Sequence, residues 1–194
     1  MTRAERDDRI PPVTGAAGRE AEGMTTVSET TGHSARAIAP AVLARLRERD
    51  DVGRPAAPFT DEEGGAPLRC CLRRSEPGER IALVSYAPLR RWAAETGAAV
   101  GAYDEQGPVF IHARECAGPA GEGHPFTNAH RVVRRYGADG HILGGRLVGE
   151  GSPRFDAAFA EAFDDPAVAL VHVRAVEYGC FLYEVRRNQV GTSP

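Results

Sequence analysis

The chain has 194 residues, the size of one domain, and its 24 basic residues against 27 acidic ones leave a net charge of −3. No lysine occurs, so every cation is an arginine, and mechanisms that need a lysine amine are excluded, such as a Schiff base, a pyridoxal phosphate anchor or a Walker phosphate loop. Because the charge is nearly balanced and the arginines are scattered among acids, nucleic acid is not an expected partner.

The chain shows no pattern of export or membrane insertion. Its apolar runs span only a few residues, far below the ~18 needed to cross a bilayer. The N-terminal residues lack the apolar core of a signal peptide. We therefore expect a cytoplasmic protein without a membrane partner, whose four cysteines stay reduced. No cofactor is expected.

Three segments of different character divide the chain. Residues 1–35 mix charged and small residues without an apolar period, which predicts a disordered extension, and Met24 offers a second start of translation within it. Residues 36–188 carry periodic apolar patterns and are predicted to form a single domain. Residues 189–194 are expected to be a tail.

The first half of the domain is predicted to hold a helix and a hairpin. Pro40 is placed in the first turn of a predicted helix, which has a helical apolar pattern and ends by Gly53. Residues 54–67 are rich in proline, glycine and acids and are expected to be a loop. Strands predicted at 68–74 and 80–86 are expected to pair across a Glu-Pro-Gly-Glu turn.

The second half is predicted to hold two further helices and most of the strands. A helix is expected at 89–99, and another at 155–163, where apolar residues recur three and four positions apart. Asp139 and Gly140 favour the positive φ angles of a hairpin turn. Strands are predicted at 108–114, 131–136, 142–148, 168–176 and 181–187. The pattern indicates an α+β domain with a mainly antiparallel sheet of six to seven strands and two or three helices.

Strand alternation separates the two adjacent cysteines. In a strand at 68–74, Cys70 lies on the apolar face, whereas Cys71 lies between Arg69 and Arg73 on the other face. Neighbouring guanidinium groups lower the pKa of a thiol. Cys71 is therefore the better candidate for a catalytic nucleophile, and the alternative is a half-buried packing residue.

Two histidines are each one strand step from an arginine. His112 shares its face with Arg114, and His172 shares its face with Arg174. A neighbouring cation disfavours the imidazolium, so both rings are expected to be neutral. If the two strands are neighbours, His112, His172 and Arg174 form a polar patch with Arg69, which we call the Arg/His patch. Arginine forks suit an anionic ligand, and the alternative is that both histidines are buried structural side chains.

A metal site is not predicted. His112, Cys116, His172 and Cys180 have the right donor types for zinc. The chain has no C-x2-C and no H-E-x2-H motif, however. The spacing of His112 and Cys116 at a strand end does not by itself indicate that both bind one metal ion.

Several short motifs occur together, namely PLRCCLR, EPGER, GPVFIH, YGADGHILGG and DPAVALVHVRAVEYGCF. With them, residues 36–187 resemble the bacterial domain of unknown function 1203 family, of an actinobacterial type. The residues that carry the resemblance are Pro67, Arg69, Leu72, Gly107, Pro108, His112, Asp139, Gly140, His172, Gly179 and Cys180. The resemblance implies no activity, but it adds Cys180 to the catalytic candidates Cys71 and His172.

The sequence leaves three functions open. The preferred one is binding of a small, anionic metabolite at the Arg/His patch. The second is an enzyme that uses a thiol, Cys71 or Cys180, with His172 as the imidazole. The third is a non-catalytic interaction protein, such as a homodimer formed through a sheet edge or a helix.

Overall fold

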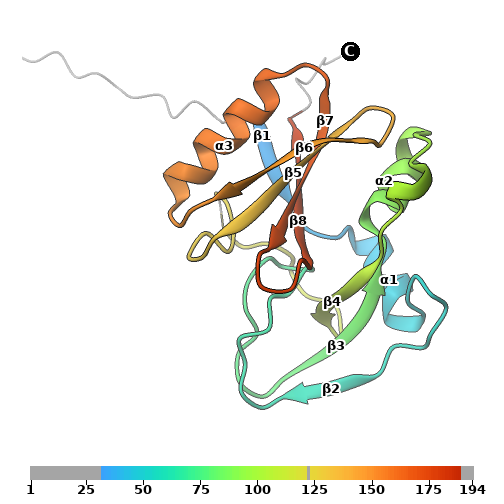
Figure 1. Ribbon diagram of the computed structural model, residues 1–194. Helices are drawn as coiled ribbons and strands as arrows, with labels where there is room; N and C mark the ends of the chain where they lie inside the picture. The colour runs from blue at the N-terminus through green and yellow to red at the C-terminus, as the bar shows by residue number, and fades with distance from the viewer. Residues whose placement is uncertain (1–31, 122, 189–194) are drawn as a thin grey trace, which may run out of the picture. The chain divides into compact units, whose positions relative to one another are not determined.

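The structure is a computed structural model that describes residues 32–121 and 123–188 (Figure 1). The described chain forms, in order, β1 (His33–Arg36), α1 (Pro40–Glu48), β2 (Pro58–Asp61), β3 (Glu79–Tyr86), α2 (Pro88–Thr96), the short 3-10 turn η1 (Gly101–Tyr103), β4 (Gly107–His112), β5 (Arg131–Gly137), β6 (Ile142–Val148), α3 (Ser152–Asp164), β7 (Val168–Ala175) and β8 (Phe181–Arg187). The predicted α+β class is confirmed, with the strands divided between two antiparallel sheets.

The larger sheet has five strands in the order β1-β8-β7-β5-β6. Its central strand β7 is buried on both faces. On one face Val173, opposite Val133 of β5, joins a core with Phe159 of α3, the helix that crosses this face in Figure 1. On the other face Leu170 packs with Trp92 of α2. Burial on both faces explains why the strand has a nearly continuous apolar sequence.

The smaller sheet has three strands in the order β2-β3-β4. β3 and β4 are paired with Ala82 opposite Ile111, and both residues are buried. Leu43 and Leu46 of α1 pack into the same core. Phe181 at the start of β8 belongs to this core as well, so the two sheets meet at the beginning of the last strand.

The predictions for the second half of the domain are confirmed. β5 and β6 form the expected hairpin, with Gly140 at a φ of +84° in its turn. The apolar face expected for the third helix is the face that α3 buries. β7 and β8 are the two last strands and pair with each other.

The strand predicted at 68–74 is wrong. The stretch forms a tight turn closed by an isolated bridge between Pro67 and Arg74, and Leu72 within it has a left-handed φ of 58°. A left-handed residue reverses the chain and ends the alternation of side chains that a strand requires. The expected hairpin with residues 80–86 therefore does not form, and β3 pairs instead with β2, from the predicted loop.

The ends of the described chain lie at the start of β1 and just after β8. β1 pairs with β8 at an edge of the larger sheet. The extension predicted for 1–35 lies outside the described residues except for positions 32–35, of which the last three belong to β1. The predicted tail at 189–194 also lies outside them. None of the described helices is long and apolar enough to cross a membrane.

Candidate metal centre

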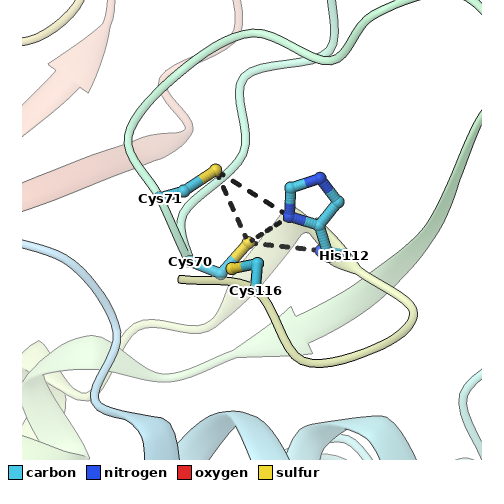
Figure 2. A group of neighbouring side chains, drawn as sticks. All are labelled: Cys70, Cys71, His112 and Cys116. Atoms are coloured by element: carbon cyan, nitrogen blue, oxygen red, sulfur yellow. Dashed lines mark hydrogen bonds between the residues drawn. The ribbon is translucent and has the colours of Figure 1, made fainter. Parts of the chain in front are cut away.

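The turn between β2 and β3 directs two adjacent cysteines to one side. The Leu68 N–H donates to the Arg73 carbonyl at 2.8 Å, and the Leu72 N–H donates back to the Leu68 carbonyl at 3.0 Å. These bonds close the turn around Cys70 and Cys71. Because the chain does not alternate as a strand does, both sulfur atoms face the same histidine ring (Figure 2).

Four donor atoms meet beside this turn (Figure 2). The Sγ of Cys70 lies 4.0 Å from the Sγ of Cys71 and 3.3 Å from the Nδ1 of His112, the last residue of β4. The Sγ of Cys71 lies 3.8 Å from the same nitrogen. Cys116, in the loop after β4, brings a third sulfur, and all four donor atoms lie within 4.8 Å of one another. We call these residues the Cys3His cluster.

The spacing of the donors matches a tetrahedral zinc site. Zinc binds thiolate sulfur at about 2.3 Å and imidazole nitrogen at about 2.0–2.1 Å. A tetrahedron with those bonds separates two sulfurs by about 3.8 Å and a sulfur from a nitrogen by about 3.6 Å. The three separations among Cys70, Cys71 and His112, 4.0, 3.3 and 3.8 Å, lie within a few tenths of an ångström of these values. The sulfur of Cys116 lies within 4.8 Å of the other donors, so a movement of up to about 1 Å completes the tetrahedron.

The second nitrogen of the His112 ring faces an ion pair. Its Nε2 lies 3.4 Å from the Oε1 of Glu79 and 3.3 Å from the Nη2 of Arg73. Arg73 forms two hydrogen bonds to Glu79, and these lower the pKa of the Glu79 carboxyl to about 2, so Glu79 is a carboxylate at neutral pH. A carboxylate that accepts the Nε2 proton leaves the lone pair on Nδ1, toward the sulfurs, which is the arrangement found behind metal-bound histidines.

Hydrogen bonds also favour a thiolate in the Cys3His cluster. The pKa of Cys71 is lowered, first because the Cys70 thiol donates a hydrogen bond to it, and further by the Arg73 backbone N–H and the nearby Arg73 guanidinium. The same bond raises the pKa of Cys70, and burial adds to the effect. The His112 backbone N–H also donates to the Cys70 sulfur at 3.3 Å. Thiolate is the form of cysteine that binds metal.

The Cys3His cluster is buried but has two approaches. Cys70 and Cys71 are 2% and 7% exposed, whereas Cys116 is only partly buried. A cavity of about 500 Å³ is lined by Cys70 and Cys116 beside α1. A neighbouring cavity of about 340 Å³ reaches Cys71 from residues 118–121 and 123–125. A metal ion therefore has a path to the donors.

The sequence of most of the described domain matches a known protein family. The family described as "Protein of unknown function (DUF1203)" matches residues 65–187, which is more than half of the chain. The chain belongs to the DUF1203 family. The match does not test the actinobacterial type, and its range contains all four residues of the Cys3His cluster. No curated protein and no solved structure matches this DUF1203 chain.

The Arg/His patch is divided between the two sheets of this DUF1203 protein. His112 ends β4 in the smaller sheet, and His172 and Arg174 lie on β7 in the larger one, so the two histidines are not on neighbouring strands. Arg174 is paired with Glu105 at 2.8 Å. Arg69 lies between the sheets, with its Nε bonded to the carbonyl of Phe181 at 2.9 Å.

The remaining catalytic candidates lie in contrasting surroundings. His172 is 1% exposed and packs between the rings of Tyr136 and Phe181, and neither of its ring nitrogens has a hydrogen-bond partner among the described residues. Burial holds the pKa of His172 well below its usual value, so the ring is neutral. Cys180 lies in the turn between β7 and β8 and is partly buried. Of the three candidates, only Cys71 lies in the Cys3His cluster.

Sequence reasoning missed Cys70 as a site residue. The predicted strand assigned Cys70 to the apolar core, on the face opposite Cys71, so the zinc donors considered from the sequence were His112, Cys116, His172 and Cys180. The signal that points to the cluster is the adjacent pair Cys70 and Cys71 together with the H-x3-C spacing of His112 and Cys116. It becomes informative only once the turn replaces the strand.

Proposed function

We propose that this DUF1203 protein binds one zinc ion, or a similar soft divalent ion, through Cys70, Cys71, His112 and Cys116. The observation that carries the proposal is the gathering of three thiols and one imidazole nitrogen within 4.8 Å of one another, with Cys70, Cys71 and His112 near tetrahedral spacing. Thiolate and imidazole donors favour zinc over the harder ions magnesium and calcium, which take oxygen ligands.

The ion serves the fold in this proposal. Four protein donors complete a tetrahedron and leave no position for water or substrate, as in structural zinc sites. The donors come from the turn between β2 and β3, from the end of β4 and from the loop after it. One ion therefore links two irregular segments to the smaller sheet.

The proposal is tested by metal content and by cobalt substitution. Protein purified without a histidine tag is expected to contain about one equivalent of zinc by elemental analysis. Cobalt is expected to replace it and to show the thiolate charge-transfer bands and the visible d–d bands of a tetrahedral ion. Cys70→Ser and Cys116→Ser each remove one thiolate, so each should weaken the charge-transfer band. Each should also lower metal affinity by more than about 100-fold, which exceeds the loss typical when a residue that only hydrogen-bonds to a ligand is replaced.

Cys180→Ser is the matched control, because Cys180 is the cysteine outside the Cys3His cluster. It is expected to keep the full spectrum and stoichiometry. A protein that takes up no metal under reducing conditions contradicts the proposal, and so does a Cys180→Ser variant that loses as much metal as Cys70→Ser.

A thiol-dependent enzyme is the second candidate, and one observation favours it. The lowered pKa of Cys71 and the 3.8 Å approach of the His112 ring resemble the pairing of a nucleophile with a base. This candidate uses His112 as the imidazole in place of His172, which is buried. It expects iodoacetamide to label Cys71 much faster than the other cysteines in the metal-loaded protein, whereas the metal site expects slow labelling until the metal is chelated.

Two other expectations stay predictions. Binding of a small anionic molecule is supported at Arg69, whose buried guanidinium has no carboxylate partner among the described residues. A homodimer is supported by β6, an edge strand of the larger sheet with Leu143 and Leu147 exposed. Light scattering of the protein at increasing concentration measures the mass that decides between monomer and dimer.

A further inference from the structure

A separate cavity, of about 320 Å³, lies where the turn between β7 and β8 meets the smaller sheet. It shares no residue with the Cys3His cluster. Its walls are mainly apolar and are formed by Leu83, Pro108, Phe110, Phe126, Ala175 and Leu182. The volume lies at the lower end of the roughly 300–1,000 Å³ typical of small-molecule sites.

Three arginines line this apolar cavity. Arg69 and Arg131 are 2% and 3% exposed, whereas Arg74 is exposed at the surface. Glu177 is the one acid among the lining residues. Its side chain is 54% exposed and lies 3.5 Å from Arg131. The cavity therefore has an excess of positive charge inside apolar walls.

Arg69 is the decisive residue because its charge is buried and has no counter-ion in the part of the chain that the structure describes. Its Nε donates to the Phe181 carbonyl at 2.9 Å, and its Nη1 donates to the Pro67 carbonyl. No ion pair and no bond from Nη2 is found among the described residues. Buried charges in proteins are normally paired, because an unpaired ion loses its hydration without compensation. An anion in the cavity supplies the missing partner.

We infer that this cavity binds a small carboxylate with an apolar body, whose carboxylate pairs with Arg69. The planar guanidinium matches a carboxylate in shape and charge. The apolar walls accept the rest of the molecule, and the ring of Tyr178, 86% exposed, stands at the edge of the cavity. Cys180 also lines it, so the thiol reports on occupancy.

The cavity is separate from the metal centre, and the anionic ligand expected from the sequence is a carboxylate bound in this cavity. A smaller cavity of about 170 Å³ adjoins this one, sharing Pro108, Tyr178 and Cys180, and is lined by Arg174 and Glu105. Because Arg174 is already paired with Glu105, that neighbour carries no unpaired charge toward a ligand.

The test compares three probes of equal length, octanoate, 1-octanol and octylamine, on the full chain by isothermal titration calorimetry. Octanoate is expected to bind at least about tenfold more tightly than 1-octanol, and octylamine more weakly than either, because the charges attract only the anion. Arg69→Met should reduce the affinity for octanoate to that for 1-octanol. Arg80→Met is the matched control, since Arg80 is an exposed arginine of β3 that contacts Thr60 outside the cavity.

A second measurement needs no variant and therefore stands even if Arg69→Met fails to fold. Saturating octanoate should slow alkylation of Cys180 by iodoacetamide at least about threefold, since the thiol is covered. Equal affinities for octanoate and 1-octanol overturn the inference, as does an alkylation rate that octanoate leaves unchanged. The zinc content of the same samples is measured in parallel, so a failure of the metal centre is seen separately.

Discussion

At the scale of single residues, the environment decides which polar side chains are chemically available. His112 and His172 look alike in sequence, each on a strand and one step from an arginine. In the structure His112 lies among sulfurs with a carboxylate behind it, whereas His172 is sealed between aromatic rings. The first is suited to hold a metal, and the second is a neutral packing group.

Glu79 is expected to act as a positioning residue for the metal ligand His112. Glu79→Ala removes the acceptor of the Nε2 proton, so zinc affinity should fall about 10- to 100-fold in competition titrations with a chromophoric chelator. Glu79→Gln keeps an acceptor oxygen and should recover most of that loss. Glu63→Ala, at an exposed acid of the preceding loop, should bind as the wild type does. If Glu79→Ala binds zinc as tightly as the wild type, the carboxylate does not support the ligand.

Burial of neutral His172 should make the protein sensitive to acid. Its pKa in the folded state lies well below the unfolded value of about 6.5, because burial disfavours the cation and Arg174, Arg134 and Arg186 repel it. The unfolded state therefore binds the proton first, and the free energy of unfolding falls as pH drops below about 6.5. From pH 6.5 to pH 5 the loss from this one group reaches at most about 1.7 kcal/mol.

The comparison of wild type with His172→Leu isolates this effect. Urea unfolding at pH 7.5, 6.5 and 5.0 should show a smaller loss of stability in the variant, by up to about 2 kcal/mol between pH 7.5 and 5.0. His33 and His124, whose pKa values burial also lowers, contribute equally to both proteins. An identical pH dependence of the two proteins would show that protonation of His172 does not lower the free energy of unfolding.

At the scale of secondary-structure elements, the local sequence pattern predicts an element correctly where that element packs on one core. The helical face of α3 and the hairpin of β5 and β6 follow directly from apolar period and turn residues. The stretch around the paired cysteines failed because its alternation of apolar and charged residues resembles a strand. Leu72 in the left-handed region shows that the turn is imposed by its surroundings, since leucine does not favour that conformation.

The buried phenylalanines of α3 should be essential to the larger sheet. Phe159 is fully buried in the core between α3 and the sheet, so Phe159→Ala should lower the free energy of unfolding by about 3–5 kcal/mol. Ala157→Ser, on the exposed face of the same helix, should change it by less than about 0.5 kcal/mol. Chemical denaturation measures both, and a small loss for Phe159→Ala would mean that the helix is not anchored there.

At the scale of the whole described molecule, the two sheets differ in what stabilises them. The larger sheet is packed by α3 on one face and by α2 on the other. The smaller sheet has only three strands and is bordered by irregular segments on the side of the Cys3His cluster. Small assemblies of this kind commonly need a metal or another cross-link to reach useful stability.

Removal of the metal should therefore lower the stability of the whole domain. At free zinc 100 times the dissociation constant, binding contributes about 2.7 kcal/mol, which corresponds to a change in Tm of about 5–10 °C for a chain of this size. Thermal unfolding with and without a chelator measures the change, and added zinc should reverse it. Cys180→Ser should respond as the wild type does, whereas a Cys70→Ser protein whose Tm still falls on chelation would place the ion elsewhere.

Sequence alone determined the class of the domain, the second-half strands and helix and the exclusion of lysine chemistry, and it named Cys71 and His112 as candidates, because each of these depends on local pattern or composition. Only the tertiary structure decided that Cys70 and Cys116 join them, that His172 is enclosed by aromatic rings and that Arg69 has no counter-ion among the described residues. The physical reason is that a site is made by groups distant along the chain. Their approach depends on how two sheets and one left-handed turn pack, which no short window of sequence encodes.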